Sequence, residues 1–146
     1  MNYIFDGYNY TVTLERGEPL IASLKQLAKD KNVKAAWING LGGSQRLELG
    51  FYNLQTKEYQ WKRFDQFLEI TSIQGNVAWQ DNEPIIHTHG TFSDGNFNTI
   101  GGHIKELEVS GTCELHLHTI FGDALKRSTD PTSGLHLLDL PHSPQD

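Results

Sequence analysis

The sequence predicts an α+β fold in which an antiparallel or mixed sheet carries at least one helix. One stretch near the N-terminus has apolar residues at helical spacing, whereas most later segments alternate apolar and polar residues in short runs. Glycine, asparagine and aspartate separate these runs, as is typical of the turns between strands. A helix that packs on such strands gives the α+β class.

The helix is predicted at about residues 18–31. Glu18 and Pro19 suit its first turn, and Lys29 and Lys31 suit its last turn, where a cation faces the helix dipole favourably. Its apolar residues share one face, which we expect to cover the sheet: Leu20, Ile21, Leu24, Leu27 and Ala28.

Strands are predicted for most of the remaining chain. They comprise residues 8–14, 34–38, 46–53, 58–64, 67–74, 75–79, 85–92, 107–109, 113–121 and 135–140. The first glycine-rich stretch, from Asn39-Gly40 to Gly43, is predicted to end a strand, and Asp81-Asn82 to turn the chain. Residues 93–98 are expected to form a polar loop. A second helix around Gly102–Leu107 has a weaker pattern.

Composition favours one soluble domain over residues 1–146, with its core at about 8–140 and a disordered tail at 141–146. The apolar runs are too short to cross a bilayer, and the first residues lack the pattern of a signal peptide. The single cysteine, Cys113, cannot form an intrachain disulfide, which fits a reducing compartment. We therefore expect a cytoplasmic protein with no membrane partner.

The charge balance argues against an electrostatic DNA-binding surface. The net charge is -6, from 12 Lys+Arg against 18 Asp+Glu, whereas DNA binding relies on clustered cations that neutralise phosphates. The densest basic spots are the pairs Lys62-Arg63 and Lys126-Arg127, which we interpret as ordinary surface charges.

Three histidines are the candidate metal ligands. His87 and His89 lie two residues apart in a strand-like segment, so their side chains point to the same face. His103 follows Gly101 and Gly102, which permit a tight backbone path that could bring a third imidazole to this face. The alternative to metal ligation is that these histidines form a half-exposed strand face or are hydrogen-bonded residues of the core.

Three neutral imidazoles suit zinc first, and also iron, nickel or copper, and they leave one coordination position open. Such a position would hold water or a small-molecule ligand. A second pair, His116 and His118, also shares a strand face. It is interpreted as a polar side that faces solvent or another subunit, or as residues that support the first site.

Other catalytic signatures are missing from the sequence, including the Gly-x-Ser-x-Gly elbow, the P-loop and the dinucleotide fingerprint. Cys113 lies in a strand-like segment and is interpreted as a buried small hydrophobe. Glu69 lies in an apolar strand, where its carboxylate faces either solvent or an interface, or holds a buried partner. Asp130 is close enough in sequence to Arg127 to form a local ion pair.

The chain resembles the PPC domain, the plant and prokaryote conserved domain, over about residues 8–140. The resemblance rests on several separated segments: Arg16-Gly17-Glu18, Gly40-Leu41-Gly42, Leu49-Gly50-Phe51-Tyr52, Lys57-Glu58-Tyr59, the stretch 68–76, His87-Thr88-His89, Gly101-Gly102-His103, Arg127, Asp130 and Gly134-Leu135.

This resemblance implies a curved, mainly antiparallel sheet and a homotrimer. It also implies that His87, His89 and His103 can hold a divalent metal. In a trimer, Glu69 or Arg127 could approach a site near a subunit boundary.

Two functions follow as hypotheses. In the first, the trimer binds a metal and a small molecule, with hydrolase or lyase chemistry if it is an enzyme; Glu69 would act as acid, base or supporting carboxylate, and Arg127 would bind an anion. In the second, it is a scaffold that contacts proteins or DNA. Plant members contact DNA through an AT-hook, but Glu18 replaces the second arginine in Arg16-Gly17-Glu18, so direct DNA binding is doubtful.

Overall fold

One helix and nine strands form the part of the chain that the computed structural model describes, residues 1–141. Their bounds are β1 Asn2–Phe5, β2 Asn9–Glu15, α1 Leu20–Asp30, β3 Ala36–Asn53, β4 Glu58–Phe64, β5 Leu68–Gln80, β6 Glu83–Ser93, β7 Thr99–Thr119, β8 Lys126–Thr129 and β9 His136–Asp139. The tail predicted at 141–146 lies, except for Pro141, outside the described residues.

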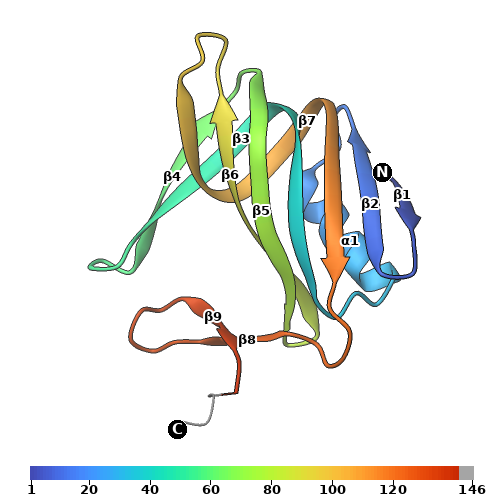
Figure 1. Cartoon of the computed structure of the whole chain (residues 1–146). Coiled ribbons are helices and arrows are strands. Elements are labelled where there is room, and N and C mark those ends of the chain that lie inside the picture. Colours follow the sequence, from blue (N-terminus) through green and yellow to red (C-terminus); the bar gives the residue numbers. More distant parts are fainter. Residues whose placement is uncertain (142–146) are drawn as a thin grey trace, which may run out of the picture.

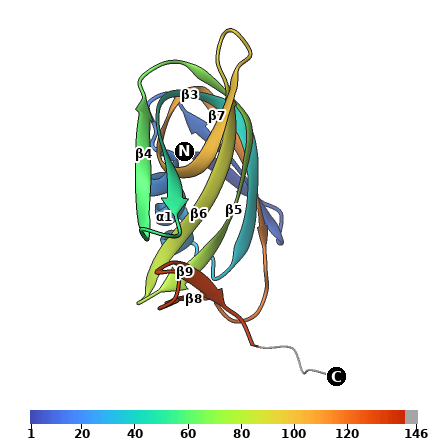
Figure 2. The same cartoon turned by 90° about the vertical axis from the view of Figure 1, so that its left-hand side faces the viewer.

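The strands form one mixed sheet in the order β1-β2-β7-β3-β5-β8-β9, with β4 paired to β3 (Figure 1). Every ladder is antiparallel except the one between β5 and β8. Because β6 pairs with both β5 and β7, the strands β3, β5, β6 and β7 form a closed circuit. The sheet is therefore strongly curved, as the resemblance implies, and the β8–β9 hairpin lies at one end of it (Figures 1 and 2).

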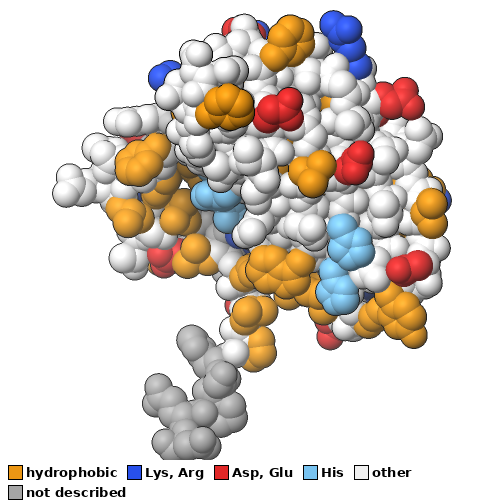
Figure 3. Space-filling model, turned by 45° about the horizontal axis from the view of Figure 1, so that its top comes forward, with side chains coloured by type: hydrophobic (Ala, Val, Ile, Leu, Met, Phe, Trp, Pro, Cys, Tyr) orange, Lys and Arg blue, Asp and Glu red, His pale blue; other side chains and the backbone are white. Residues whose placement is uncertain are grey.

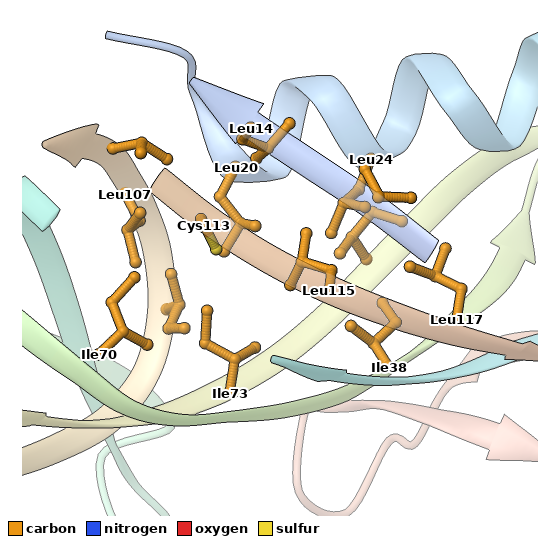
Figure 4. Packing of buried hydrophobic residues seen from close by; sticks show 14 of the residues in the cluster. Leu14, Leu20, Leu24, Ile38, Ile70, Ile73, Leu107, Cys113, Leu115 and Leu117 are labelled. Atoms are coloured by element: carbon orange, nitrogen blue, oxygen red, sulfur yellow. The ribbon is translucent and has the colours of Figure 1, made fainter. Parts of the chain in front are cut away.

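The core lies between helix α1 and the inner face of the curved sheet (Figure 4). Helix α1 packs against β6 and β7 and buries Leu20, Leu24, Leu27 and Ala28, which confirms the predicted stripe. Pro19 is the N-cap of the helix, so Glu18 lies just outside it. Cys113 is fully buried among the apolar residues of this core, as predicted.

The glycine-rich segment from Asn39 to Gly43 does not end a strand, contrary to the prediction, because β3 runs through it without a break. The pairing of β3 with β5 shifts register between Gly40 and Gly42, and Gly42 has a φ of 145°. A Cβ at Gly42 would lie 2.2 Å from the Thr112 carbonyl oxygen. These glycines therefore serve a bulge and a close strand contact, as glycine often does within strands.

The predicted second helix at Gly102–Leu107 is wrong, because this segment is part of the long strand β7. Ile104 and Leu107 are buried three residues apart, which imitates helical spacing. The spacing arises from a register shift: Leu47 pairs with Leu107, whereas Leu49 pairs with Ile104. One extra residue in β7 changes the period of two expected for a regular strand.

Other predictions differ from the structure in smaller ways. The segments predicted as two strands at 107–109 and 113–121 join within β7, and those at 67–74 and 75–79 join within β5. Strands β1 and β8 had no clear sequence signal. The Asp81-Asn82 turn is confirmed, since both residues have positive φ and Gln80 pairs with Glu83. Among the described residues, no helix is long and apolar enough to cross a membrane.

Candidate metal centre

Strands β6 and β7 bring the three predicted histidines together. His89 lies directly opposite His103 in the β6–β7 ladder, and His87 lies two residues before His89. The ring centroids are 5.2 Å apart for His87 and His89, and 5.3 Å apart for each of the pairs that include His103. One nitrogen from each ring lies within 4.8 Å of the other two.

The alternation of β6 explains why two of the rings share one face. The even-numbered residues from Pro84 to Phe92 are buried toward the core, so the odd-numbered His87 and His89 project from the opposite face. The glycines before His103 lie in extended β7 rather than in a turn. A Cβ at Gly101 would lie 2.9 Å from the Gly90 carbonyl oxygen, so a side chain there would push β7 away from β6.

Burial keeps the imidazoles of His87 and His103 neutral. It is the largest cause that lowers the pKa of each to about 4, from an ordinary value of 6.5. For His87 the next cause is the positive charge of Arg127. Both rings are therefore uncharged at neutral pH, which metal ligation requires.

The donor set fits a metal of the zinc type. Zinc–nitrogen bonds of about 2.0–2.1 Å put the ligand nitrogens of a tetrahedral site about 3.4 Å apart, so nitrogens within 4.8 Å need only a small closure. His103 Nδ1 is also buried without a hydrogen-bond partner among the described residues. Buried polar atoms are rarely left unpaired, and coordination would satisfy this nitrogen.

Arg127, in β8, contacts the histidine cluster directly. Its Nη2 lies 2.8 Å from Asn76 Oδ1 and 3.1 Å from His87 Nδ1. Its Nη1 donates a hydrogen bond to the carbonyl oxygen of His136 in β9. The predicted ion pair between Arg127 and Asp130 is not formed, because Asp130 accepts hydrogen bonds from Ser133 instead.

An aromatic wall borders the cluster on the side of β4. We use this name for Tyr59 and Trp61, whose rings stack with centroids 4.5 Å apart. The Tyr59 ring lies 5.2 Å from the ring of His103. Gly50 makes room for the wall, because a Cβ there would lie 2.4 Å from the Trp61 ring. Lys105 Nζ also lies 4.8 Å from the centroid of the Trp61 ring.

The structure does not bring Glu69 to the histidines within one chain. Glu69 is exposed and pairs with Ser93, which lies four residues along β6 from His89, or about 13 Å at the rise of a strand. In residues 1–141, the only cluster of three or more His, Cys, Asp or Glu side chains with metal-binding geometry is the three histidines.

His116 and His118 lie on the same sheet face but farther away. The row from His89 crosses Gln74 in β5 and Asn39 in β3 before it reaches His116 in β7. Three strand spacings of about 4.8 Å place the two histidines about 14 Å apart. Figure 3 shows the histidine side chains gathered at two separate places. His118 bonds Asn9, so this pair does not support the first site.

Sequence reasoning missed Asn76 and the aromatic wall. Asn76 is 6% exposed and precedes the buried Val77 and Ala78. An amide next to such an apolar pair is the one signal in the sequence that could have identified it. Tyr59 and Trp61 alternate in β4, whose hairpin with β3 could be predicted and is confirmed, but nothing in that pattern places their rings next to His103 in β7.

Comparison with known families decides the identity of the fold. The model of the Plants and Prokaryotes Conserved (PCC) domain, the family also abbreviated PPC, matches residues 2–121. The chain belongs to the PCC-domain family. The three histidines of this PCC protein lie inside the matched segment, whereas Arg127 and the β8–β9 hairpin lie beyond it. No curated protein matches the chain.

Solved structures with the PCC fold include several that are similar over nearly their whole length. A "putative DNA-binding protein" from Ralstonia eutropha JMP134 is 33% identical, with a TM-score of 0.89 over 95% of this chain and 96% of that one. A metal-containing protein from Archaeoglobus fulgidus is 30% identical, with a TM-score of 0.85 over 96% and 99%. A PPC protein from Pyrococcus horikoshii is 28% identical, with a TM-score of 0.87 over 94% of each chain.

Proposed function

We propose that this PCC protein binds a divalent metal, with zinc as the first candidate, through His87, His89 and His103. The observation that carries the proposal is the convergence of three imidazole nitrogens within 4.8 Å of one another. The similarity to a metal-containing protein from Archaeoglobus fulgidus adds support. Three protein ligands are typical of sites that keep a position open, whereas structural zinc sites usually have four.

A small anionic molecule is the ligand class that the surroundings of this open site favour. The guanidinium of Arg127 is the cation nearest the histidines, because its Nη2 lies 3.1 Å from His87. The aromatic wall shields one side of His103 from water. A zinc ion would supply Lewis acidity and would lower the pKa of a bound water to about 7. Such chemistry serves hydrolases and lyases alike, and the described residues do not favour either class.

Metal analysis of the purified protein tests the proposal directly. The protein, prepared without chelators, should contain about one metal ion per chain when measured by inductively coupled plasma mass spectrometry. The double variant His87→Ala/His89→Ala should lose this metal. The matched control His116→Ala/His118→Ala removes an equally spaced strand pair and should keep it. A wild-type protein without stoichiometric metal, or a triad variant that retains it, would refute the proposal.

A second candidate function is assembly, favoured by exposed apolar side chains of strand β3. Trp37 is 51% exposed and Leu41 is 55% exposed on the sheet, which is typical of surfaces that contact other chains. We propose a homotrimer that buries these residues at its interface, and in which Glu69 would approach the site of a neighbouring subunit. Light scattering that gives the mass of one chain at micromolar concentration would reject it.

Direct DNA binding has less support. The similarity to a "putative DNA-binding protein" favours it, but the net charge of -6 opposes it. Binding to duplex DNA should weaken steeply as salt rises if phosphates are contacted. No retention on duplex DNA at low salt would exclude this role for the isolated chain.

A further inference from the structure

The hydrogen bonds of Arg127 determine which nitrogen of His87 has a free lone pair. A guanidinium group has only donors, so Arg127 Nη2, 3.1 Å from His87 Nδ1, can only donate to that nitrogen. A neutral imidazole has one N–H and one acceptor nitrogen. When Nδ1 accepts from Arg127, the proton of the ring must therefore be on Nε2.

This tautomer cannot bind a metal through either nitrogen. Coordination through Nε2 needs the lone pair that the proton occupies, and it would turn Nδ1 into an N–H that faces the N–H of Arg127. Coordination through Nδ1 needs the lone pair that Arg127 already uses. Whichever nitrogen is the ligand, the bond between Arg127 and His87 and a metal on His87 exclude each other.

We propose that Arg127 and the metal compete for His87, so that metal binding releases the guanidinium and loosens the β8–β9 hairpin that carries it. The inference rests on the proposed metal-binding function and adds a regulator to the same site. Release would free Asn76 Oδ1, which lies 2.8 Å from Arg127 Nη2 and belongs to the residue opposite His87 in the β5–β6 ladder. If His87 binds metal through Nε2, Asn76 becomes an acceptor for its Nδ1–H, as metal-bound histidines commonly require.

The displacement is feasible because the hairpin is weakly attached. Arg127 Nε is buried and has no hydrogen-bond partner among the described residues, so moving to water would satisfy it. Strand β8 pairs with β5 at a single position, Trp79 with Lys126. At the far end of the hairpin, Tyr52 donates a hydrogen bond to the Ser133 carbonyl oxygen. A shift of β8 would therefore break few contacts with the sheet.

Release also explains how the same arginine could serve a ligand. While Arg127 is bound to His87, Asn76 and His136, its guanidinium is committed to protein acceptors. Once displaced, it would remain near the metal as an available cation for the anionic group of a small molecule. Metal binding would thus come before anion binding in the assembly of the site.

The test compares the metal affinity of Arg127→Met with that of the control Lys126→Met. Both variants remove one positive charge from β8, but Lys126 is exposed and does not contact the cluster. Zinc affinity is measured by competition with a chromophoric chelator. Arg127→Met should bind zinc about tenfold or more tightly than wild type, since a hydrogen bond to a charged group is typically worth at least that factor. Lys126→Met should stay within about twofold.

A second measurement uses only the wild-type protein and does not depend on how a variant folds. Hydrogen exchange of the backbone amides in residues 126–139 should become faster when zinc is added, while exchange in the core strand β7 should not. Unchanged or slower exchange in the hairpin, or an Arg127→Met affinity equal to or below that of wild type, would overturn the competition but leave the metal site intact. If neither wild type nor Arg127→Met binds zinc, both proposals fail.

Discussion

Substitution of Gly75 by alanine should reduce the stability of the protein and disturb the proposed metal site. Gly75 lies in β5 opposite Thr88, the residue between His87 and His89. An alanine Cβ would lie 2.2 Å from the His87 carbonyl oxygen and 2.9 Å from the Thr88 Cα, both backbone atoms. A carbon–oxygen contact normally requires about 3.3 Å, so β5 and β6 would have to separate by about 1 Å.

The expected cost follows from this separation. Two ladder hydrogen bonds that lengthen past their normal range would lose about 1 kcal/mol each, and overpacking in a close strand contact adds about 1–3 kcal/mol. We expect Gly75→Ala to reduce the free energy of unfolding by about 3–5 kcal/mol. For a chain of this size the midpoint of thermal unfolding should fall by about 6–20 °C. The same shift should weaken zinc binding, because His87 and His89 flank the disturbed residue.

Urea and thermal unfolding of Gly75→Ala, monitored by circular dichroism, measure the loss. Gly111→Ala is a suitable control, since Gly111 is also in a strand and a Cβ there would meet nothing within 4 Å. This control should stay within about 0.5 kcal/mol of wild type. If Gly75→Ala is also within about 1 kcal/mol of wild type, the argument that glycine is required for close strand contact beneath the histidines is wrong.

Three further predictions concern buried groups and the hairpin. Burial raises the pKa of the Cys113 thiol to about 12, so a thiol reagent at pH 8 should label the protein only after denaturation; rapid labelling of the native state would contradict this. The pKa values of His87 and His103 are lowered in the folded state, to about 4 from 6.5, so the unfolded state takes up protons at a higher pH than the folded state does. The free energy of unfolding of the metal-free protein should therefore decrease as pH falls from about 6.5 to about 4. The decrease should be smaller when both histidines are replaced by glutamine. Urea titrations at each pH measure this, and a stability that does not change with pH would count against neutral buried rings. Tyr52→Phe removes the hydrogen bond to Ser133 and should speed amide exchange around residues 130–135. The free energy of global unfolding should change by no more than about 1.5 kcal/mol. Unaltered exchange would show that this bond does not hold the hairpin.

The sequence was sufficient to predict that the three histidines of the candidate metal centre lie together. Strand alternation placed His87 and His89 on one face, and the glycines before His103 indicated a close backbone approach. The contacts of Arg127 were beyond this reasoning, because they depend on a single bridge between β8 and β5 that leaves no repeated pattern in the chain. Asn76 could not be chosen over other strand amides before its ladder to β6 was known.

The errors in the fold have one physical origin. A bulge in β7 placed Ile104 and Leu107 at a helical spacing, and the glycines that accommodate a register shift in β3 resembled the end of a strand. Both irregularities occur where long strands bend to close the circuit of β3, β5, β6 and β7. Sequence periodicity assumes regular elements, and it fails where a strand inserts an extra residue to curve the sheet.

The position of the β8–β9 hairpin has a practical consequence for anyone who redesigns this protein. All three imidazoles belong to strands of the closed circuit. Within residues 1–141, the guanidinium that touches them comes from a hairpin whose ladder with that circuit is a single residue pair, supplemented by a few side-chain hydrogen bonds. Exchange or shortening of this hairpin would therefore alter ion affinity and access while the ligating rings and the packed interior stay as they are. The proposed metal affinity could therefore be adjusted through the β8–β9 hairpin without redesign of the closed circuit of strands.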